Sequence, residues 1–325
     1  MSTGRPGVLV CGCRRPEELL LVLSRIPRRY RAILSLDKPK GKDDQINFRE
    51  CVRIAQKHPR IGRLRVRRHL GCRRHLQTAI SDAFGEYESL IILEDDTVPT
   101  AGFFLFCEKH LKRKPQTKPG IGAICGTRCM PESFLAGEYL SHYTAIYGWA
   151  TWRWVWKRYV TFCHNNDFTE VRKAARSRFM SGAYSKFFSH ALDRIATKSL
   201  DTWDYQLMAM FLAENLVCLY PKNNLITNVG IHGGTHVKKI IFPVGLSSVA
   251  TCSPPQNLVA INLEKTWIPA NQWHFRCLNP DDPWLDNGRL KKLSQKWSRC
   301  VIRLRKVLWR LSQRVRCKTL ASFES

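Results

Sequence analysis

Leu90-Ile91-Ile92-Leu93-Glu94-Asp95-Asp96 is the stretch that decides the fold, because four apolar residues run directly into three acids. A continuous apolar run is typical of a strand buried on both faces, as in a parallel sheet covered by helices. Open α/β sheets bind ligands in the crevice beyond the carboxyl ends of their strands. The stretch therefore predicts a buried strand whose acids lie at a binding edge.

The three acids allow two interpretations. In an extended segment, Glu94 and Asp96 are expected to point to one side and Asp95 to the other. Carboxylate oxygens are hard ligands that suit Mg²⁺ or Mn²⁺, especially where a diphosphate supplies further oxygens. The alternative is a solvated acidic turn. Since adjacent carboxylates at a strand end repel one another unless a cation lies among them, the sequence favours a metal–phosphate site.

The rest of the chain alternates between strand patterns and helix patterns. Leu64-Arg65-Val66-Arg67 alternates as an exposed edge strand does. Pro16, followed by two acids, predicts a helix start. Repeated alternation of this kind predicts an α/β fold with a mostly parallel sheet flanked by helices. Strands are expected at 8–11, 32–36, 90–93, 121–125, 216–220 and 225–229, and helices at 16–26, 48–56, 76–84, 103–111 and 208–213.

Composition indicates a globular protein with an anionic partner. The hydrophobic fraction of 44% predicts a real core, and the net charge of +27 predicts binding to nucleic acid, acidic phospholipid or phosphorylated substrates. The sequence shows neither an apolar run of about 18 residues for a membrane span nor a signal-peptide core. Its 13 cysteines include no CxxC pair, which argues against a zinc site. These features predict free thiols and a cytoplasmic location.

Two later stretches combine aromatic rings with groups that suit a substrate site. Gly148-Trp149-Ala150-Thr151-Trp152 places flat rings beside a glycine, a suitable floor for a sugar ring, although core filling explains most such rings. In Trp203-Asp204-Tyr205-Gln206 the acid lies at an expected helix start among aromatics. Asp204 is therefore either a partly desolvated general base or a helix cap. His232 and His236, in a glycine-rich loop, are candidates for metal ligation.

The C-terminal stretch 289–318 has a pattern of its own. It carries twelve Lys or Arg and no acid, and its apolar residues recur at steps of three and four. A basic amphipathic helix is typical of a segment on an anionic membrane surface. The alternatives are a helix that packs its stripe on the domain, or a nucleic-acid-binding helix, for which no recognised motif is present. The stripe consists of Leu293, Trp297, Val301, Leu304, Leu308, Leu311 and Val315.

Four motifs in this order give the chain a family resemblance. From about Val8 to His236 it resembles the GT-A-fold nucleotide-sugar glycosyltransferases, in particular bacterial relatives of eukaryotic N-acetylglucosaminyltransferase I. The resemblance implies a GT-A (Rossmann-like) domain over 1–248, an irregular wrapping segment over 249–288, and a basic amphipathic helix and tail over 289–325. The four motifs are Glu94-Asp95-Asp96, Gly148-Trp149-Ala150-Thr151-Trp152, Trp203-Asp204-Tyr205-Gln206 and Gly234-Thr235-His236.

The resemblance also implies a role for individual residues. Asp204 is expected to deprotonate the acceptor hydroxyl, and Asp96 and His236 are expected to bind Mn²⁺ or Mg²⁺. The residues implied to contact the nucleotide-sugar are Arg15, Asp37, Glu94 and Asp95, and those implied on the acceptor and sugar side are Trp149, Trp152 and Trp203.

Together these expectations describe a metal-dependent, inverting glycosyltransferase, either a hexosyl- or an N-acetylhexosaminyltransferase. It is expected to move a sugar from a UDP-sugar to a hydroxyl of a cell-surface glycan or lipid-linked acceptor, in bacterial polysaccharide biosynthesis at the cytoplasmic face of the inner membrane. Two alternatives are a catalytically inactive nucleotide- or glycan-binding module and a basic nucleic-acid-binding protein. The intact acids argue against the first, and the lack of a nucleic-acid-binding motif argues against the second.

Overall fold

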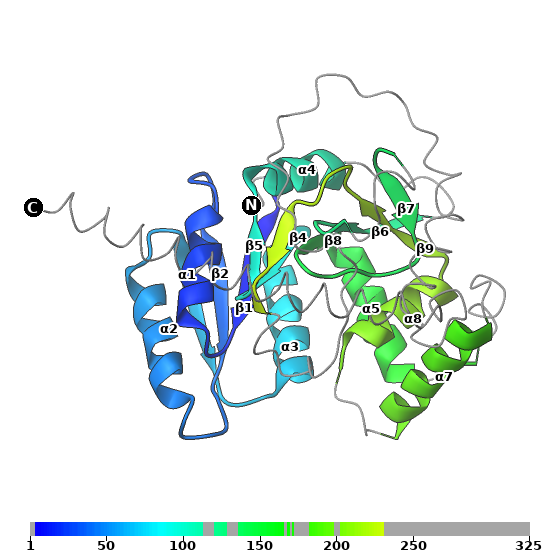
Figure 1. The fold of residues 1–325 in the computed structure, drawn as a ribbon, viewed down its shortest axis with the longest axis horizontal. Helices are drawn as coiled ribbons and strands as arrows, with labels where there is room; N and C mark the ends of the chain where they lie inside the picture. Colours follow the sequence, from blue (N-terminus) through cyan, green and yellow to red (C-terminus); the bar gives the residue numbers. More distant parts are fainter. Residues whose placement is uncertain are drawn as a thin grey trace, which may run out of the picture. The chain divides into compact units, whose positions relative to one another are not determined.

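An eight-stranded mixed sheet flanked by helices forms the centre of the fold (Figure 1). The structure, a computed structural model, describes residues 4–112, 120–128, 136–165, 168–169, 171, 182–197 and 202–230. The predicted ligand His236, the segment 249–288 and the predicted helix in 289–325 lie outside the described residues. All described residues belong to one unit of the chain.

Within the described residues, each strand and helix that the sequence predicts is present, with ends that differ by a few residues. The strands Thr97–Pro99, Tyr139–Ser141 and Trp149–Trp152 and the helix Arg153–Asn165 were not predicted. The strands are β1 (Gly7–Gly12), β2 (Ala32–Asp37), β3 (Ile61–Arg67), β4 (Ser89–Glu94), β5 (Thr97–Pro99), β6 (Gly120–Cys125), β7 (Tyr139–Ser141), β8 (Trp149–Trp152), β9 (Leu216–Tyr220) and β10 (Ile226–Asn228). The helices are α1 (Pro16–Arg25), α2 (Gln45–Lys57), α3 (Cys72–Phe84), α4 (Ala101–Leu111), α5 (Arg153–Asn165), α7 (Gly182–Ala196) and α8 (Asp204–Ala213).

The strand order in the sheet is β3-β2-β1-β4-β8-β6-β9-β7. Strands β3, β2, β1 and β4 are mutually parallel, as are β6 and β9. Strand β8 runs antiparallel to both β4 and β6, and β7 runs antiparallel to β9. The predicted α/β class is confirmed, and the sheet is mixed. Strands β5 and β10 pair separately as a short antiparallel ribbon.

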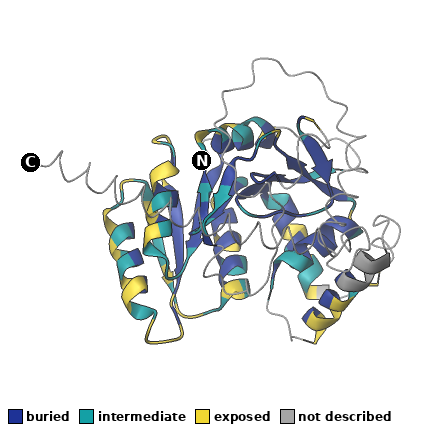
Figure 2. Ribbon diagram, in the orientation of Figure 1, coloured by how far each residue is buried: buried dark blue, intermediate teal, exposed yellow. Residues whose placement is uncertain are grey.

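Burial of the strands follows their sequence patterns (Figure 2). Strands β2 and β9 are buried along their whole lengths, and β4 is buried from Leu90 to Leu93, as continuous apolar runs require. Strand β3 alternates between half-buried and exposed residues and occupies one edge of the sheet. The prediction of an exposed edge strand at Leu64-Arg65-Val66-Arg67 is therefore confirmed.

The helices bury the apolar stripes that predicted them. Helix α1 starts at Pro16 and buries Leu19, Val22 and Leu23. Helices α3 and α5 are joined by polar contacts as well as by packing: Trp156 Nε1 donates to Ser81 Oγ at 2.9 Å. None of the helices in the described part of the chain combines the length and the apolar character that a bilayer crossing requires.

The order of the strands places a reversal of direction between β1 and β4, and the edge beyond their carboxyl ends is called the crevice below. The chain builds outward from β1 to β2 and β3, and α3 then returns it to β4 on the other side of β1. This reversal is a topological switch point, where α/β sheets bind ligands beyond the carboxyl ends of the strands. Glu94 ends β4 and Arg15 follows β1, so both residues lie at this crevice.

Candidate functional site

The three acids form a closed turn at the carboxyl end of β4. Glu94 is the last residue of the strand, and Asp95 and Asp96 make the turn. The Thr97 hydroxyl closes this turn, because it accepts the Glu94 N–H at 2.8 Å and donates to the Glu94 carbonyl at 3.0 Å. The expectation that Asp95 and Asp96 point to opposite sides is wrong, since strand alternation stops where the turn begins.

A single arginine nitrogen joins the two turn aspartates. Arg15 Nη1 lies 3.0 Å from Asp95 Oδ1 and 2.5 Å from Asp96 Oδ2. Arg15 immediately precedes α1, and its carbonyl accepts the Leu19 N–H at 2.9 Å, which anchors its backbone to the start of that helix. In this structure Arg15 therefore provides the positive charge that the sequence predicts among these acids.

Asp95 is held from the β1 side as well. Its carboxylate accepts the Cys13 N–H at 3.1 Å, and its own N–H donates to the Cys11 carbonyl at 2.8 Å. A Cβ at Gly12 would lie 3.0 Å from Asp95 Oδ2, so the backbone after β1 lies directly against this carboxylate. Asp95 is 6% exposed and is therefore fixed on several sides.

A segment from far along the chain covers Asp96. Strand β10 pairs with β5, and the Val229 N–H donates to the Asp96 carbonyl at 2.8 Å. A Cβ at Gly230 would lie 1.9 Å from Asp96 Oδ2, a separation that only glycine avoids. Gly230 thus forms one wall around the Asp96 carboxylate, and Arg15 lies in contact with the same oxygen.

The electrostatics of the site disfavour three ionised acids. Desolvation and the charges of Asp96 and Asp95 raise the pKa of Glu94 to about 8. Desolvation raises the pKa of Asp95 to about 6, although Arg15 opposes it, and it raises the pKa of Asp96 as well. With all three acids ionised, Arg15 cancels one of three negative charges. The site therefore favours binding of further positive charge.

Asp204 contributes to the same electrostatic environment. It is the first residue of α8, and its charge is one of the causes that raise the pKa of Glu94. Its Oδ1 accepts the Thr202 hydroxyl and, at 2.9 Å, the Tyr205 N–H. Among the described residues, no partner contacts Oδ2. One oxygen of Asp204 therefore accepts hydrogen bonds at the start of the helix, and the other stays available. This arrangement is compatible with Asp204 as a helix cap and with Asp204 as a general base.

The three predicted sugar-side rings are buried. Trp149 and Trp152 lie on β8, between β4 and β6 in the sheet, and are 1% and 9% exposed. Trp203 is 4% exposed, and its ring centroid lies 5.7 Å from that of Trp149. Core packing accounts for these rings, and their role in sugar binding stays a prediction.

Asp37 has a defined structural partner at the same edge of the sheet. Its two carboxylate oxygens accept the N–H groups of Leu70 and Gly71, at 2.9 and 3.0 Å. Asp37 therefore fixes the turn that leads into α3. Its expected contact with the nucleotide is an additional role that stays a prediction.

A basic rim surrounds this edge of the sheet. Lys38, Lys40 and Lys42 follow β2, Arg68 follows β3, and all four are exposed. His69 Nδ1 lies 3.0 Å from the Lys38 carbonyl, which joins the two loops. In the described part of the chain, none of these four cations contacts a carboxylate. They form a positive surface beside the acidic crevice, suited to attracting anionic ligands.

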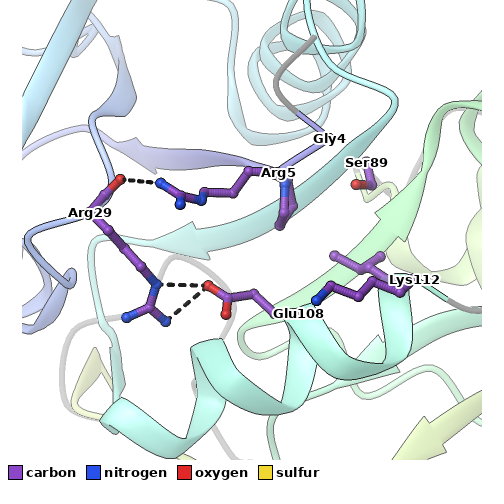
Figure 3. Close-up of a pocket in the computed structure, with 8 residues that line it drawn as sticks. Gly4, Arg5, Arg29, Ser89, Glu108 and Lys112 are labelled. Carbon is purple, nitrogen blue, oxygen red and sulfur yellow. Dashed lines mark hydrogen bonds and ion pairs between the residues drawn. The ribbon is translucent and has the colours of Figure 1, made fainter.

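A second hollow lies at the opposite, amino end of the sheet (Figure 3). Its volume is about 360 Å³, and Arg29 Nε donates to Glu108 at 2.9 Å within it. Residues 1–3 and 113–119, which adjoin it in the chain, lie outside the described residues. It is lined by Gly4, Arg5, Pro6, Arg29, Ser89, Glu108, Leu111 and Lys112.

The donor chemistry of the crevice fits a divalent cation, although the described residues do not form a ready cluster. Within the described ranges, no three His, Cys, Asp or Glu side chains group closely enough to hold a metal ion. Asp95 and Asp96 nevertheless converge on one point, with the backbone at Gly230 against Asp96. Two converging carboxylates in a crevice with excess negative charge suit Mg²⁺ or Mn²⁺.

Sequence reasoning missed three groups that build this site. Thr97 shapes the turn, Gly230 walls Asp96, and Arg15 is a counter-ion as well as a residue of the opening loop. The position of Arg15 leaves a signal in the sequence, because the carboxyl ends of neighbouring parallel strands meet at one edge. The pairing of β10 with β5, which positions Gly230, leaves none. No protein-family model matches this chain, and no curated protein matches it.

Proposed function

We propose that the protein is a metal-dependent glycosyltransferase of the GT-A fold that uses a nucleotide-sugar donor. The observation that carries this proposal is the convergence of Asp95 and Asp96 at the β1–β4 switch point, where pairing with Arg15 leaves one of their two negative charges uncompensated. A nucleotide diphosphate bound with a divalent cation brings both the positive charge and the oxygen ligands that such a site accepts.

Separate residues of the site would bind the metal and accept the proton. Asp96, with Asp95 and the predicted ligand His236, would hold Mn²⁺ or Mg²⁺, which when bound offsets the charge of the leaving diphosphate. Asp204 takes the proton from the acceptor hydroxyl through its available Oδ2. Attack on the side of the sugar opposite the leaving group gives inversion at the anomeric carbon. A product with retained configuration, identified by NMR, would contradict this mechanism.

The basic rim supports an anionic donor and an anionic acceptor. Lys38, Lys40, Lys42 and Arg68 raise the local concentration of phosphate-bearing ligands, and the acids at the crevice bind them only together with a cation. We favour a UDP-sugar as the donor and a cell-surface glycan or lipid-linked sugar as the acceptor. Nucleic acid is the second candidate for the positive surface. It predicts duplex binding with a steep salt dependence and a defined site size.

The direct test is calorimetric titration of UDP into the protein with and without Mn²⁺. Wild type is expected to bind UDP only with the metal, and Asp96→Ala to lose that binding. Asp44→Asn is the matched control, because Asp44 lies near the same edge but pairs with Arg14. UDP binding that is equal in wild type and Asp96→Ala would exclude the acids as the donor site. GDP, dTDP and CMP repeat the test for other nucleotides.

Membrane attachment is proposed for the segment 289–325, at the cytoplasmic face of the inner membrane. Its twelve cations and apolar stripe match an anionic bilayer surface. Sedimentation with vesicles tests this attachment. The full chain is expected to bind vesicles that contain anionic lipid and to bind neutral vesicles weakly. Equal binding by a chain that lacks 289–325 would contradict the assignment.

A further inference from the structure

We propose that Arg15 is a resident counter-ion of the acidic turn. It holds Asp95 and Asp96 until a divalent cation replaces it, and the released guanidinium then binds the diphosphate of the donor. The second step rests on the proposed function; the first concerns only this chain and the metal.

The first step follows from mutual exclusion. One nitrogen, Arg15 Nη1, contacts an oxygen of each aspartate, at 3.0 and 2.5 Å. A metal ion that bridges the same two oxygens must occupy the space that this nitrogen fills. Like charges also repel at this distance, so the guanidinium and a divalent cation cannot both be held there.

Charge balance favours the replacement of Arg15 by a divalent cation. The Asp95 and Asp96 carboxylates paired with Arg15 alone retain one negative charge, whereas a divalent cation in its place neutralises both. The Arg15 backbone stays fixed at the start of α1, so the displaced side chain remains at the crevice. Its side chain is 22% exposed, which leaves it a route out of the contact. A guanidinium beside bound metal is suited to pair with phosphate oxygens.

The test of the first step uses Mn²⁺ alone, without nucleotide. Free Mn²⁺ is followed by its electron paramagnetic resonance signal during titration of wild type and Arg15→Gln. The variant is expected to bind Mn²⁺ at least ten-fold more tightly, because the competing cation is gone. Asp96→Asn introduced into the same variant is expected to remove that gain.

The matched control is Arg14→Gln. It removes the same charge from the neighbouring residue, whose guanidinium pairs with Asp44 and not with the turn. Its Mn²⁺ affinity is expected to stay within about two-fold of wild type. An Arg15→Gln variant no tighter than wild type, or an equal gain in Arg14→Gln, would overturn the counter-ion role.

Arg15→Gln leaves the acids unpaired and lowers stability, so a second measurement is made on the same protein. The midpoint of urea unfolding is recorded against Mn²⁺ concentration. The proposal expects Mn²⁺ to raise the midpoint more in Arg15→Gln than in wild type, with Arg15→Lys between them. An equal rise in all three would contradict it.

The second step is tested by adding UDP. Arg15→Gln is expected to bind UDP in the presence of Mn²⁺ about ten-fold more weakly while binding Mn²⁺ alone more tightly. A purely structural role would not move the two affinities in opposite directions. Unchanged UDP affinity would overturn the second step. Failure of wild type to bind UDP would overturn it together with the proposed function, while the Mn²⁺ titration still decides the first step.

Discussion

The two ends of the central sheet both pair arginine with carboxylate, but with opposite charge balance. At the carboxyl end, Arg15 serves two aspartates beside a third acid, and negative charge is in excess. At the amino end, Glu108 accepts from Arg29 and Tyr30, with Arg5 and Lys112 nearby, and positive charge is in excess (Figure 3). Glu108 is one carboxylate with two side-chain donors, whereas Asp95 and Asp96 share one guanidinium nitrogen and can still bind a cation.

The largest expected difference between the two ends comes from removing each arginine. Arg15→Gln leaves part-buried acids uncompensated and is expected to lower the free energy of unfolding by about 3–5 kcal/mol at pH 8 in EDTA. Arg29 belongs to a more exposed pair, at 37% and 23% side-chain exposure, so Arg29→Gln should cost about 1 kcal/mol or less. Urea unfolding measures both. Equal losses would show that the two ends are electrostatically alike.

The acids themselves are expected to give effects of opposite sign. Because the pKa of Glu94 rises from 4.5 to about 8 on folding, the folded state binds a proton that the unfolded state releases between these values. The free energy of unfolding should therefore fall by about 3–4 kcal/mol as pH rises from 5 to 8. Glu94→Gln removes that dependence and stabilises the protein at pH 8. Glu108→Gln removes the negative charge that pairs with Arg29, and this variant should lower the free energy of unfolding by about 1 kcal/mol. Urea titrations across this pH range check both, and a Glu94→Gln profile as steep as wild type would refute the assignment.

A glycine pair tests how tightly the carboxyl end is built. Gly230→Ala places a methyl group 1.9 Å from Asp96 Oδ2 and must displace that carboxylate. A loss of about 1–2 kcal/mol in unfolding free energy is expected, with weaker metal-dependent UDP binding. Gly41→Ala is the control, since its methyl group would meet nothing within 4 Å. If both variants match wild type in unfolding and in UDP calorimetry, the close contact between Gly230 and the Asp96 carboxylate would be refuted.

The smallest effect is expected at Gln206, on α8. Gln206 is 2% exposed, and neither polar atom of its amide has a hydrogen-bond partner among the residues that the structure describes. Gln206→Met, similar in volume, should raise the free energy of unfolding by about 1 kcal/mol if the amide is merely orphaned. A thermal melt of the variant measures this. Destabilisation instead would mean that the amide is paired in solution, for example by a buried water.

The sequence predicted those features that depend on local pattern. The apolar run before Glu94 fixed a buried strand, Pro16 marked a helix start, and the alternation of Leu64-Arg65-Val66-Arg67 marked an edge. Each of these signals is contained in a few neighbouring residues. The placement of three acids and Arg15 at one edge also follows from sequence, because parallel strands share their carboxyl side.

Features that depend on pairing between distant segments could not be predicted in the same way. The four residues Trp149–Trp152 fit a strand and an aromatic cluster equally, and only the antiparallel register with β4 and β6 shows that they lie inside the sheet. The convergence of Asp95 and Asp96 depends on a turn that Thr97 closes, where the alternation of a strand no longer applies. The ion pair between Arg15 and Asp95 joins residues 80 positions apart.

The covering of Asp96 by Gly230 has a consequence for biosynthesis. The turn acids leave the ribosome long before the segment that completes their surroundings through the Val229 N–H. At roughly 5–20 residues per second, the intervening chain takes on the order of ten seconds to synthesise. During that interval β1 to β4 can pair while one side of Asp96 faces solvent. The surroundings of Asp96 are therefore complete only after β10 has paired with β5. A nascent or truncated chain that ends before β10 contains the three acids but lacks the segment that encloses Asp96.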